Sequence, residues 1–96
     1  MLDDLEQLKS ISFEDILRLF IYDYFINNRF ENNTIYDYLK IFYQKYSNFF
    51  NYFSDVDYNV FKYITSQRLN SLFNSDFNFN YISSVYSLLS HYLNIN

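Results

Sequence analysis

The sequence predicts an all-α protein, a single-domain bundle of four or five helices that takes in residues 1–96. Apolar side chains recur at spacings of three and four residues through most of the chain, which is the period of an α-helix. The alternation typical of β-strands is absent, and a chain without glycine lacks the usual hairpin turns. Its 96 residues, half of them hydrophobic, are enough for one domain with a core.

Three of the expected helices begin with a capping motif. In this motif a Ser or Thr side chain caps the first turn and an acidic residue follows three positions later, here Asp in place of the usual Glu. The three pairs are Ser12 with Asp15, Thr34 with Asp37, and Ser54 with Asp57.

A short N-terminal helix precedes the first cap. Leu2, Leu5 and Leu8 recur at helical spacing, and acidic residues come early while Lys9 comes late, an order that suits the helix dipole. Because an isolated helix of this length is marginal, we expect it to depend on packing.

The central helix of the bundle is predicted at about residues 13–28. Between residues 16 and 26 only Arg18 and Asp23 are charged, and a helix that is apolar nearly all round belongs inside a protein. We assign to its inward arc Phe13, Ile16, Leu17, Leu19, Phe20, Tyr24 and Ile26, and to its narrow outer face Glu14, Arg18, Tyr22, Phe25 and Arg29.

The remaining helices follow the later caps. The helix after Thr34 has the cleanest period in the chain, carried by Ile35, Leu39, Phe42, Tyr46, Phe49 and Phe53. The helix after Ser54 is either one long helix or is bent near residues 65–67, where its apolar face rotates. The last helix, at about residues 80–93, is expected to face inward with Tyr81, Ile82, Val85, Leu88, Leu89, Tyr92 and Leu93.

The amino-acid composition points to an AT-rich gene. The chain has 12 Tyr and 12 Phe but no Ala, Gly, Pro, Trp or Cys, and the missing residues are those with GC-rich codons. Such a bias is typical of a virus, phage, plasmid or symbiont, whose small proteins are often binders and inhibitors. A domain of this size buries only about 60–65% of its chain surface, so some of the 24 rings must lie at a surface or an interface.

Charge and hydropathy set limits on the partners. The net charge of −4 disfavours non-specific binding to nucleic acid or anionic lipid, and the acidity is concentrated in residues 1–31. No apolar stretch is long enough to span a membrane, and the acidic N-terminal region is unlike a signal peptide. We therefore expect a cytoplasmic protein, in the host cytoplasm if it is viral, and no membrane partner.

No residue pattern predicts catalysis. Ser87 and His91 lie four residues apart, as two members of a hydrolase triad could, but the Gly-rich turns that usually supply oxyanion donors are absent. A single His without Cys does not make a metal site, so we expect no catalytic residue, no metal and no cofactor.

Asp23 is the one charged residue placed within the apolar arc. A buried carboxylate without a partner would be costly, so we expect a Tyr hydroxyl, an Arg or a Lys to meet it. A structural hydrogen bond within the bundle is favoured over a functional acid.

Two groups of aromatic and apolar residues fall on helix faces that are expected to be exposed to solvent. Tyr22 and Phe25 share the outer face of the central helix with Arg18 and Arg29. A second line on the next helix consists of Ile41, Lys45 and Tyr52. Aromatic side chains rimmed by basic ones are typical of protein interfaces, although further packing within the chain could also cover them.

The last helix suggests self-association. Its outer face carries Ser84, Ser87 and His91 but no Lys, Arg, Asp or Glu, whereas solvated faces are usually charged. The centres of interfaces are depleted in charge, so this face is expected to pair two copies in a homodimer. The alternative is that this face is solvated, and that it carries Ser and Asn instead of charged residues because the gene is AT-rich.

The leading hypothesis is a non-enzymatic protein that acts by binding another protein, for example as a viral or phage inhibitor of a host defence or regulatory factor. One alternative is a helix-turn-helix nucleic-acid binder that uses the helices after Thr34 and Ser54. Its phosphate contacts would come from Lys40, Lys45, Lys62 and Arg68. Another alternative is a structural subunit of a homo-oligomer.

Overall fold

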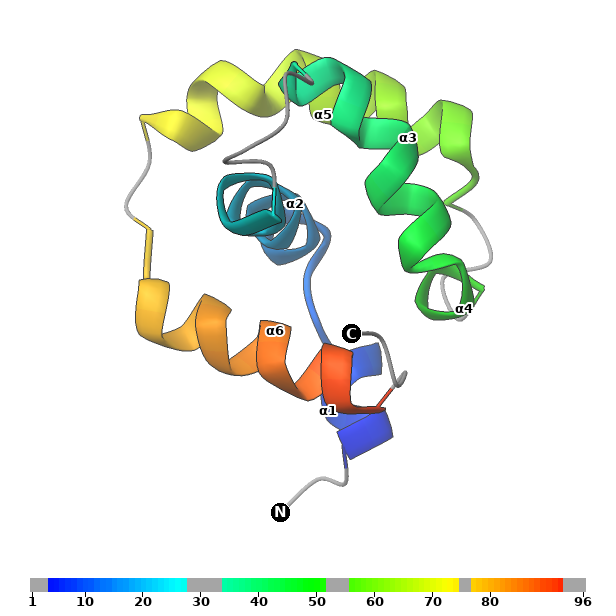
Figure 1. Cartoon of the computed structure of the whole chain (residues 1–96), viewed down its shortest axis with the longest axis vertical. Helices are drawn as coiled ribbons and strands as arrows, with labels where there is room; N and C mark the ends of the chain where they lie inside the picture. The colour runs from blue at the N-terminus through cyan, green and yellow to red at the C-terminus, as the bar shows by residue number, and fades with distance from the viewer. Residues whose placement is uncertain (1–3, 28–33, 52–55, 75–76, 93–96) are drawn as a thin grey trace.

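The computed structural model describes residues 4–27, 34–51, 56–74 and 77–92, and all regular structure in these ranges is helical. Five helices and one single-turn helix follow one another along the chain, as predicted for an all-α bundle (Figure 1). They are α1 (Asp4–Lys9), α2 (Phe13–Asn27), α3 (Ile35–Lys45), α4 (Ser47–Phe50), α5 (Tyr58–Phe73) and α6 (Phe79–Tyr92).

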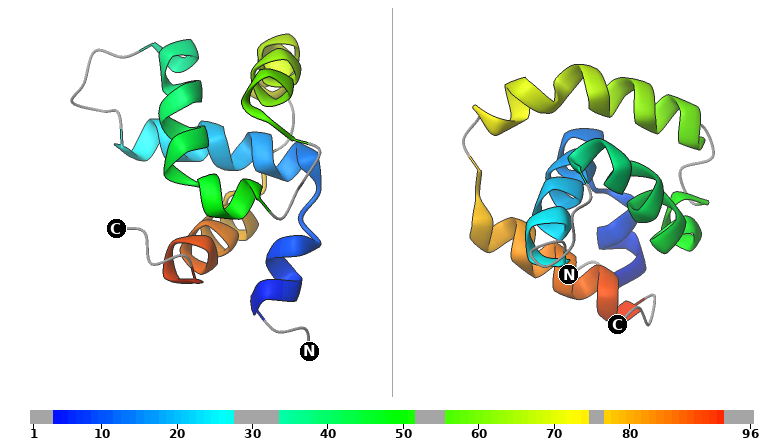
Figure 2. Two further views of the ribbon diagram at one scale, coloured as in Figure 1. Left: turned by 90° about the vertical axis from the view of Figure 1, so that its right-hand side faces the viewer. Right: turned by 45° about the horizontal axis from the view of Figure 1, so that its top comes forward.

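Helix α2 lies between two layers. It packs against α3 and α5 on one side and against α6 on the other, and α1 packs on α6 (Figure 1). In the side view, α2 crosses the molecule with α5 above it and with α1 and α6 below it, while α3 runs down across α2 (Figure 2). The prediction that the helix at about residues 13–28 is central is therefore confirmed.

The sequence of α2 explains its place. The Ser12 hydroxyl accepts a hydrogen bond from the backbone N–H of Asp15, which caps the first turn as expected. Its buried side chains lie on more than one face, because different helices cover α2 from both sides. They are Ile16, Leu17, Leu19, Phe20, Ile21 and Asp23. Ile26, which we had placed on the inward arc, is instead 40% exposed near the end of the helix.

A cluster of aromatic rings fills the space between α2, α3 and α5. Phe20, Phe42 and Phe61 are fully buried at its centre, and the centroids of their rings lie 5.4–6.0 Å apart. Phe50 adds a fourth ring, with its centroid 5.2 Å from that of Phe61. Offset and edge-to-face ring contacts of this kind contribute stability beyond the area that they bury.

The helix that we expected to run without a break from residue 35 to residue 53 ends at Lys45. Tyr46 has φ −108° and ψ 29°, outside the helical region, and closes α3 before the single turn of α4. The break turns Phe49 and Phe50 into the core and leaves the Tyr46 side chain fully buried. The apolar period continues through it, so periodicity alone could not reveal it.

The two remaining caps differ from each other. Thr34 and Asp37 form the predicted capping box, each side chain bonding to the backbone of the other residue. Asp57 is itself the N-cap of α5, because its carboxylate accepts a hydrogen bond from the backbone N–H of Val60. Ser54 lies outside the described residues. Helix α5 then continues without a break through residues 65–67, so the segment is one long helix.

Helix α6 turns an aliphatic face to the core. Ile82, Val85 and Leu89 are buried, as expected, and Leu88 is half-buried. Tyr81 had also been placed inward but is 45% exposed. Tyr81 directly precedes the buried Ile82 in the first turns of the helix, and successive residues of a helix point in different directions, so Tyr81 faces away from the core.

Candidate functional site

The main polar feature of the interior is a group of side chains around Asp23, which we call the Asp23 hub. The Asp23 carboxylate is fully buried and accepts hydrogen bonds from three of the helical elements around it. The donors are Asn27 Nδ2 (2.7 Å), Tyr38 Oη (2.5 Å), Lys45 Nζ (2.9 Å), Tyr46 Oη (3.4 Å) and Tyr86 Oη (2.7 Å). The partners expected for this carboxylate, a Tyr hydroxyl and a Lys, are thus both present.

Local sequence places these donors. Asn27 is one helical turn beyond Asp23 on α2, which brings its amide to the carboxylate. Tyr38 and Lys45 are seven residues apart on α3 and therefore share one face, and the break after Lys45 directs Tyr46 to the same point. Tyr86 reaches the hub from α6 and also accepts a hydrogen bond from Asn27 Nδ2.

The hub places one basic side chain and several hydroxyls around the buried Asp23 carboxylate. Lys45 supplies the opposite charge, and its ammonium nitrogen lies 5.2 Å from the ring centroid of Tyr46 and 5.9 Å from that of Tyr86. Burial, followed by the nearby charge of Asp23, raises the pKa of Tyr46 well above its ordinary value. The Tyr46 hydroxyl therefore stays protonated and acts as a donor.

The hub is suited to joining helices. Both Asp23 oxygens already accept hydrogen bonds, one from Tyr38 and the other from Lys45 and Tyr86 among others. A carboxylate that is matched in this way has no free lone pair directed at a substrate, and it has no solvent exposure. This supports the interpretation of Asp23 as a structural residue.

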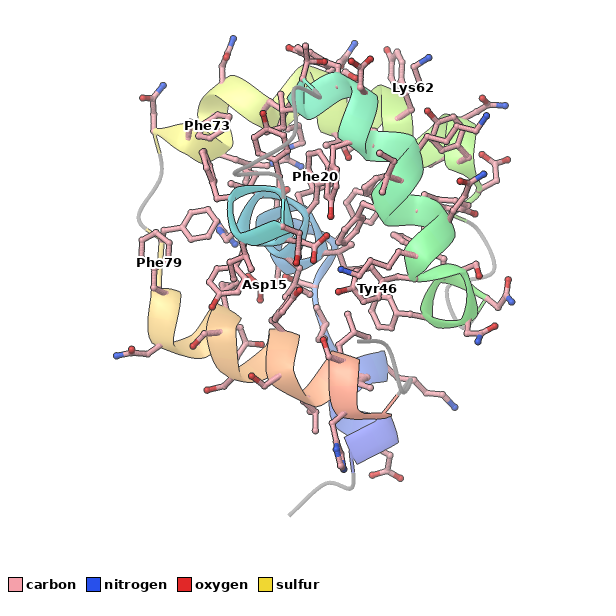
Figure 3. The ribbon with its side chains drawn as sticks, viewed as in Figure 1. Asp15, Phe20, Tyr46, Lys62, Phe73 and Phe79 are labelled. Atoms are coloured by element: carbon pink, nitrogen blue, oxygen red, sulfur yellow. The ribbon has the colours of Figure 1, made fainter. Side chains whose placement is uncertain are left out.

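A second feature is a set of exposed aromatic residues at the ends of α2, α5 and α6. Phe25, Phe73 and Phe79 are 58%, 47% and 62% exposed, and we call these three residues the aromatic junction. The ring centroids of Phe25 and Phe73 are 6.1 Å apart. Phe79 packs on half-buried Phe77, and it lies on the same side of the molecule as Phe73 (Figure 3).

A pocket of about 210 Å³ opens between the first turns of α2 and α6. It is lined by Asp15, Arg18, Asn78, Tyr81 and Ile82. Arg18 Nη1 lies 2.8 Å from the Asp15 carboxylate, and the Tyr81 hydroxyl also bonds to Asp15. Burial, with the Asp15 carboxylate next, raises the pKa of Tyr81. The buried Nε–H of Arg18 has no acceptor among the described residues.

The structure separates the residues expected to bind a partner. Phe25 is exposed and Arg18 lines the pocket, whereas Tyr22 is half-buried with its ring centroid 5.1 Å from that of Tyr86. Tyr22 is therefore mainly a packing residue, because α6 covers that side of α2. Arg29 lies outside the described residues.

The second expected line, on α3, is also divided. Ile41 is 41% exposed, but the ammonium group of Lys45 is bound to Asp23 rather than presented to a partner. We had placed Lys45 at a partner-binding surface. The sequence of its own helix does not reveal that the buried Asp23 of another helix lies beside it. Tyr52 lies outside the described residues.

The residues expected to pair two copies are accessible. Ser84, Ser87 and His91 are exposed along α6, and the Ser84 hydroxyl donates to the backbone carbonyl of Asn80. Ser90, three residues beyond Ser87, is half-buried and its hydroxyl bonds to Tyr46, so the exposed face of α6 does not include it.

Sequence reasoning missed several residues of both features. It gave no role to Asn27, Tyr38, Tyr46 and Tyr86 in the hub, nor to Phe73 and Phe79 in the aromatic junction. Tyr38 and Lys45 on one helix face were a usable signal, because a Tyr and a Lys seven residues apart can serve one acceptor. The packing of Phe73 from α5 on Phe25 from α2 left no such local signal.

Comparison of the chain with protein-family models, curated proteins and solved structures finds no match. Within the part of the chain that the structure describes, no helix has the length and apolar character needed to cross a membrane. The function must therefore be argued from the hub, the pocket and the surface.

Proposed function

We propose that this chain is a non-enzymatic protein that acts by binding another protein, as a virus- or phage-encoded inhibitor of a host defence or regulatory factor in the host cytoplasm. The observation that carries the proposal is the exposure of three aromatic residues of the aromatic junction, Phe25, Phe73 and Phe79, of which Phe25 and Phe73 pack ring against ring. Grouped exposed aromatics are characteristic of contact sites, where such rings act as anchors.

The neighbouring pocket supports the same assignment. It lies on α2 and α6, the two helices that also carry Phe25 and Phe79, and its lining offers both donors and acceptors. Protein interfaces commonly combine aromatic anchors with polar groups of this kind at their rim. Arg18, which we expected to contact the partner, would do so from this pocket.

The origin and the class of partner rest on the composition. An AT-rich gene is typical of viruses and phages, and the net charge of −4 favours a protein partner over nucleic acid. These two arguments support a protein target in the host cell that the virus or phage infects.

The helix-turn-helix alternative receives less support from the geometry. Of the four basic residues that it requires, Lys45 is paired with Asp23 and Arg68 with Glu14. Helices α3 and α5 are joined through α4 and a further segment, whereas the turn of a helix-turn-helix motif has three or four residues. Lys40 and Lys62 alone make a weak phosphate-binding surface.

A second candidate, the homo-oligomer subunit, is favoured by α6. From Phe79 to Tyr92 this helix contains no Lys, Arg, Asp or Glu, and Ser84, Ser87 and His91 are exposed along it. Two copies with a charge of −4 each would meet with least repulsion through such a face. A homodimer is compatible with partner binding at the aromatic junction.

Site-specific photo-crosslinking tests the proposed function. A photoreactive phenylalanine analogue at Phe79 should crosslink a host protein in a lysate of infected cells. The double variant Phe25→Asp, Phe73→Asp should abolish that crosslink, because it places two charges among the anchoring rings. The matched control is Tyr63→Asp on α5, a substitution of an aromatic that is 64% exposed outside the junction.

Two outcomes would contradict the proposal. One is a crosslink that survives the double variant or is lost equally in Tyr63→Asp. The other is binding that disappears between about 50 and 200 mM salt and after nuclease treatment, which is the behaviour of phosphate-driven contacts.

Light scattering at micromolar concentrations tests the homodimer. Ser84→Lys with Ser87→Lys should dissociate a dimer, because two like charges from each copy would meet near the symmetry axis. A monomer throughout this concentration range, or a dimer unaffected by the lysines, would show that α6 does not pair two copies.

A further inference from the structure

The two layers of the molecule are joined in different ways. Helix α6 packs on α1 and α2, and α1 packs on α6; in the described residues neither packs on α3 or α5. The apolar surface that α6 buries is aliphatic, from Ile82, Val85 and Leu89. The backbone of α1 and α6 therefore lies apart from that of α3 and α5, and side chains make the contact between α6 and α3.

Hydroxyl groups provide the link between α6 and α3. Tyr86 Oη lies 2.7 Å from an Asp23 oxygen, and that same oxygen binds Lys45 Nζ of α3 at 2.9 Å. Ser90, one turn further along α6, bonds to the Tyr46 hydroxyl at the end of α3. Through these contacts a buried charge on α2 holds the second layer against the first.

We propose that the Asp23 hub is a latch, and that α1 and α6 open together as one unit while α2, α3 and α5 remain folded. In the open state Tyr38 and Lys45 still bind Asp23, because both come from α3, and only the Tyr86 and Ser90 contacts are lost. Opening would uncover Ile82, Val85 and Leu89. Cooperative units of this kind, with their own opening free energy, are a general property of native proteins.

The argument gives Tyr86 and Tyr38 different roles, although each donates one hydroxyl to Asp23. Tyr86→Phe removes a contact that exists only in the closed state, so it should favour the open state. Tyr38→Phe removes a contact that is present in both the closed and the open state. It should therefore leave the opening of α1 and α6 unchanged and lower only the stability toward global unfolding.

Native-state hydrogen exchange of the full chain, followed by NMR at low urea concentrations, tests the latch. In the wild type, the slowest amides of α1 and α6 should share one urea slope, smaller than that of α2, α3 and α5. Tyr86→Phe should speed their exchange about tenfold, the expected effect of losing a hydrogen bond to a charged group. Tyr38→Phe should leave α1 and α6 within about twofold of the wild type while it speeds exchange in α3 and α5.

The conservative change from Tyr to Phe keeps the ring, so both variants are expected to fold. If Tyr38→Phe speeds exchange in α6 as much as Tyr86→Phe does, the molecule opens as a single unit and there is no latch. If Tyr86→Phe leaves the exchange of α6 unchanged, the Tyr86 hydroxyl does not control the opening. Either result overturns the proposal.

Discussion

The two sides of α2 are held by different chemistry. Toward α3 and α5 the contact is a cluster of stacked and edge-to-face rings, centred on Phe20, Phe42 and Phe61. Toward α6 the fully buried side chains are aliphatic, and the Tyr86 hydroxyl adds a directional hydrogen bond to Asp23. The rings bury a large apolar area on the side of α3 and α5, while the hydrogen bonds of the Asp23 hub, from both α3 and α6, fix which groups must meet.

The comparison shows how a chain with few amino-acid types obtains both effects. The sequence has equal numbers of Phe and Tyr, which differ by one hydroxyl. Phe42 fills the apolar cluster, whereas buried Tyr38 and Tyr46 pack their rings on their neighbours and present the hydroxyl to Asp23. Apolar packing has no preferred direction, so by itself it tolerates alternative arrangements of the helices. A buried polar group must meet its hydrogen-bond partners, which reduces the number of arrangements that are possible.

The largest effect is expected on the ring side. Phe42→Ala should lower the free energy of unfolding by about 3–5 kcal/mol, because it removes a fully buried ring and leaves a cavity. Urea denaturation followed by circular dichroism measures this. The matched control is Phe79→Ala, whose ring is 62% exposed and should contribute within about 0.5 kcal/mol. Equal losses in the two variants would refute the assignment of the ring cluster as the core.

The next effect is expected in the hub. Lys45→Met keeps most of the aliphatic stem but leaves the buried Asp23 carboxylate without its counter-charge. We expect a loss of about 1.5–3 kcal/mol, the range for hydrogen bonds to charged groups. Lys40→Met, on the exposed surface of the same helix, is the control and should stay within about 0.5 kcal/mol. If both variants were equally stable, the ion pair between Lys45 of α3 and Asp23 of α2 would contribute nothing to the stability of the hub.

Much of the fold could be predicted from the sequence, because helical period and caps are local signals. The central helix and the capping box at Thr34 follow from residues close together in the chain. The end of α3 at Lys45 could not be predicted in this way. The break after it is set by tertiary contacts, since the Tyr46 hydroxyl must reach Asp23 on another helix while Phe50 enters the ring cluster.

The candidate site was only partly predictable for the same reason. The need of Asp23 for a partner followed from its place in an apolar arc, but the identity of Tyr86 as a partner depends on a contact 63 residues away in the chain. The exposure of Phe25 was expected from the outer face of its helix, whereas Phe73 joins it from α5. Lys45 was assigned to the surface because a pattern of polar spacing cannot distinguish a solvated lysine from one paired with a buried acid.

Alkaline pH should weaken the hub. Burial and the charge of Asp23 raise the pKa of Tyr46 in the folded protein, whereas in the unfolded chain the phenol has its ordinary pKa of about 10. Stability from this group is therefore complete below about pH 10 and is lost as the pH rises above that value, by about 1.4 kcal/mol per pH unit. Urea denaturation between about pH 9 and 11 measures the slope.

The Tyr46→Phe variant isolates this contribution from the other titrating groups. The Phe side chain at position 46 cannot ionise. The free energy of unfolding of this variant should therefore fall less steeply with pH than that of the wild type, and the difference in slope should correspond to one proton. Tyr63→Phe removes an exposed hydroxyl and should retain the steep slope of the wild type. Parallel slopes for the wild type and Tyr46→Phe would show that Tyr46 ionises as readily in the folded chain as in the unfolded one.

The smallest effect is expected in the middle of α5, on the ring side of the comparison. Thr65 is fully buried, and its hydroxyl has no hydrogen-bond partner among the described residues. Thr65→Val replaces this hydroxyl by a methyl group of similar size. We expect a gain of about 1 kcal/mol, because the cost of burying an unsatisfied donor is removed. For a domain of this size, the midpoint of thermal unfolding should rise by about 4–8 °C.

The same substitution at Thr34 provides a control of opposite sign. The Thr34 hydroxyl accepts the hydrogen bond that caps α3, so Thr34→Val should lower stability by about 1 kcal/mol. A loss of stability in Thr65→Val as well would mean that the Thr65 hydroxyl binds a buried water molecule, and the side of α2 that faces α5 would then depend on a directional contact in addition to its rings. A gain at Thr65 with a loss at Thr34 would confirm that the buried Thr65 hydroxyl adds only a desolvation cost to the ring side.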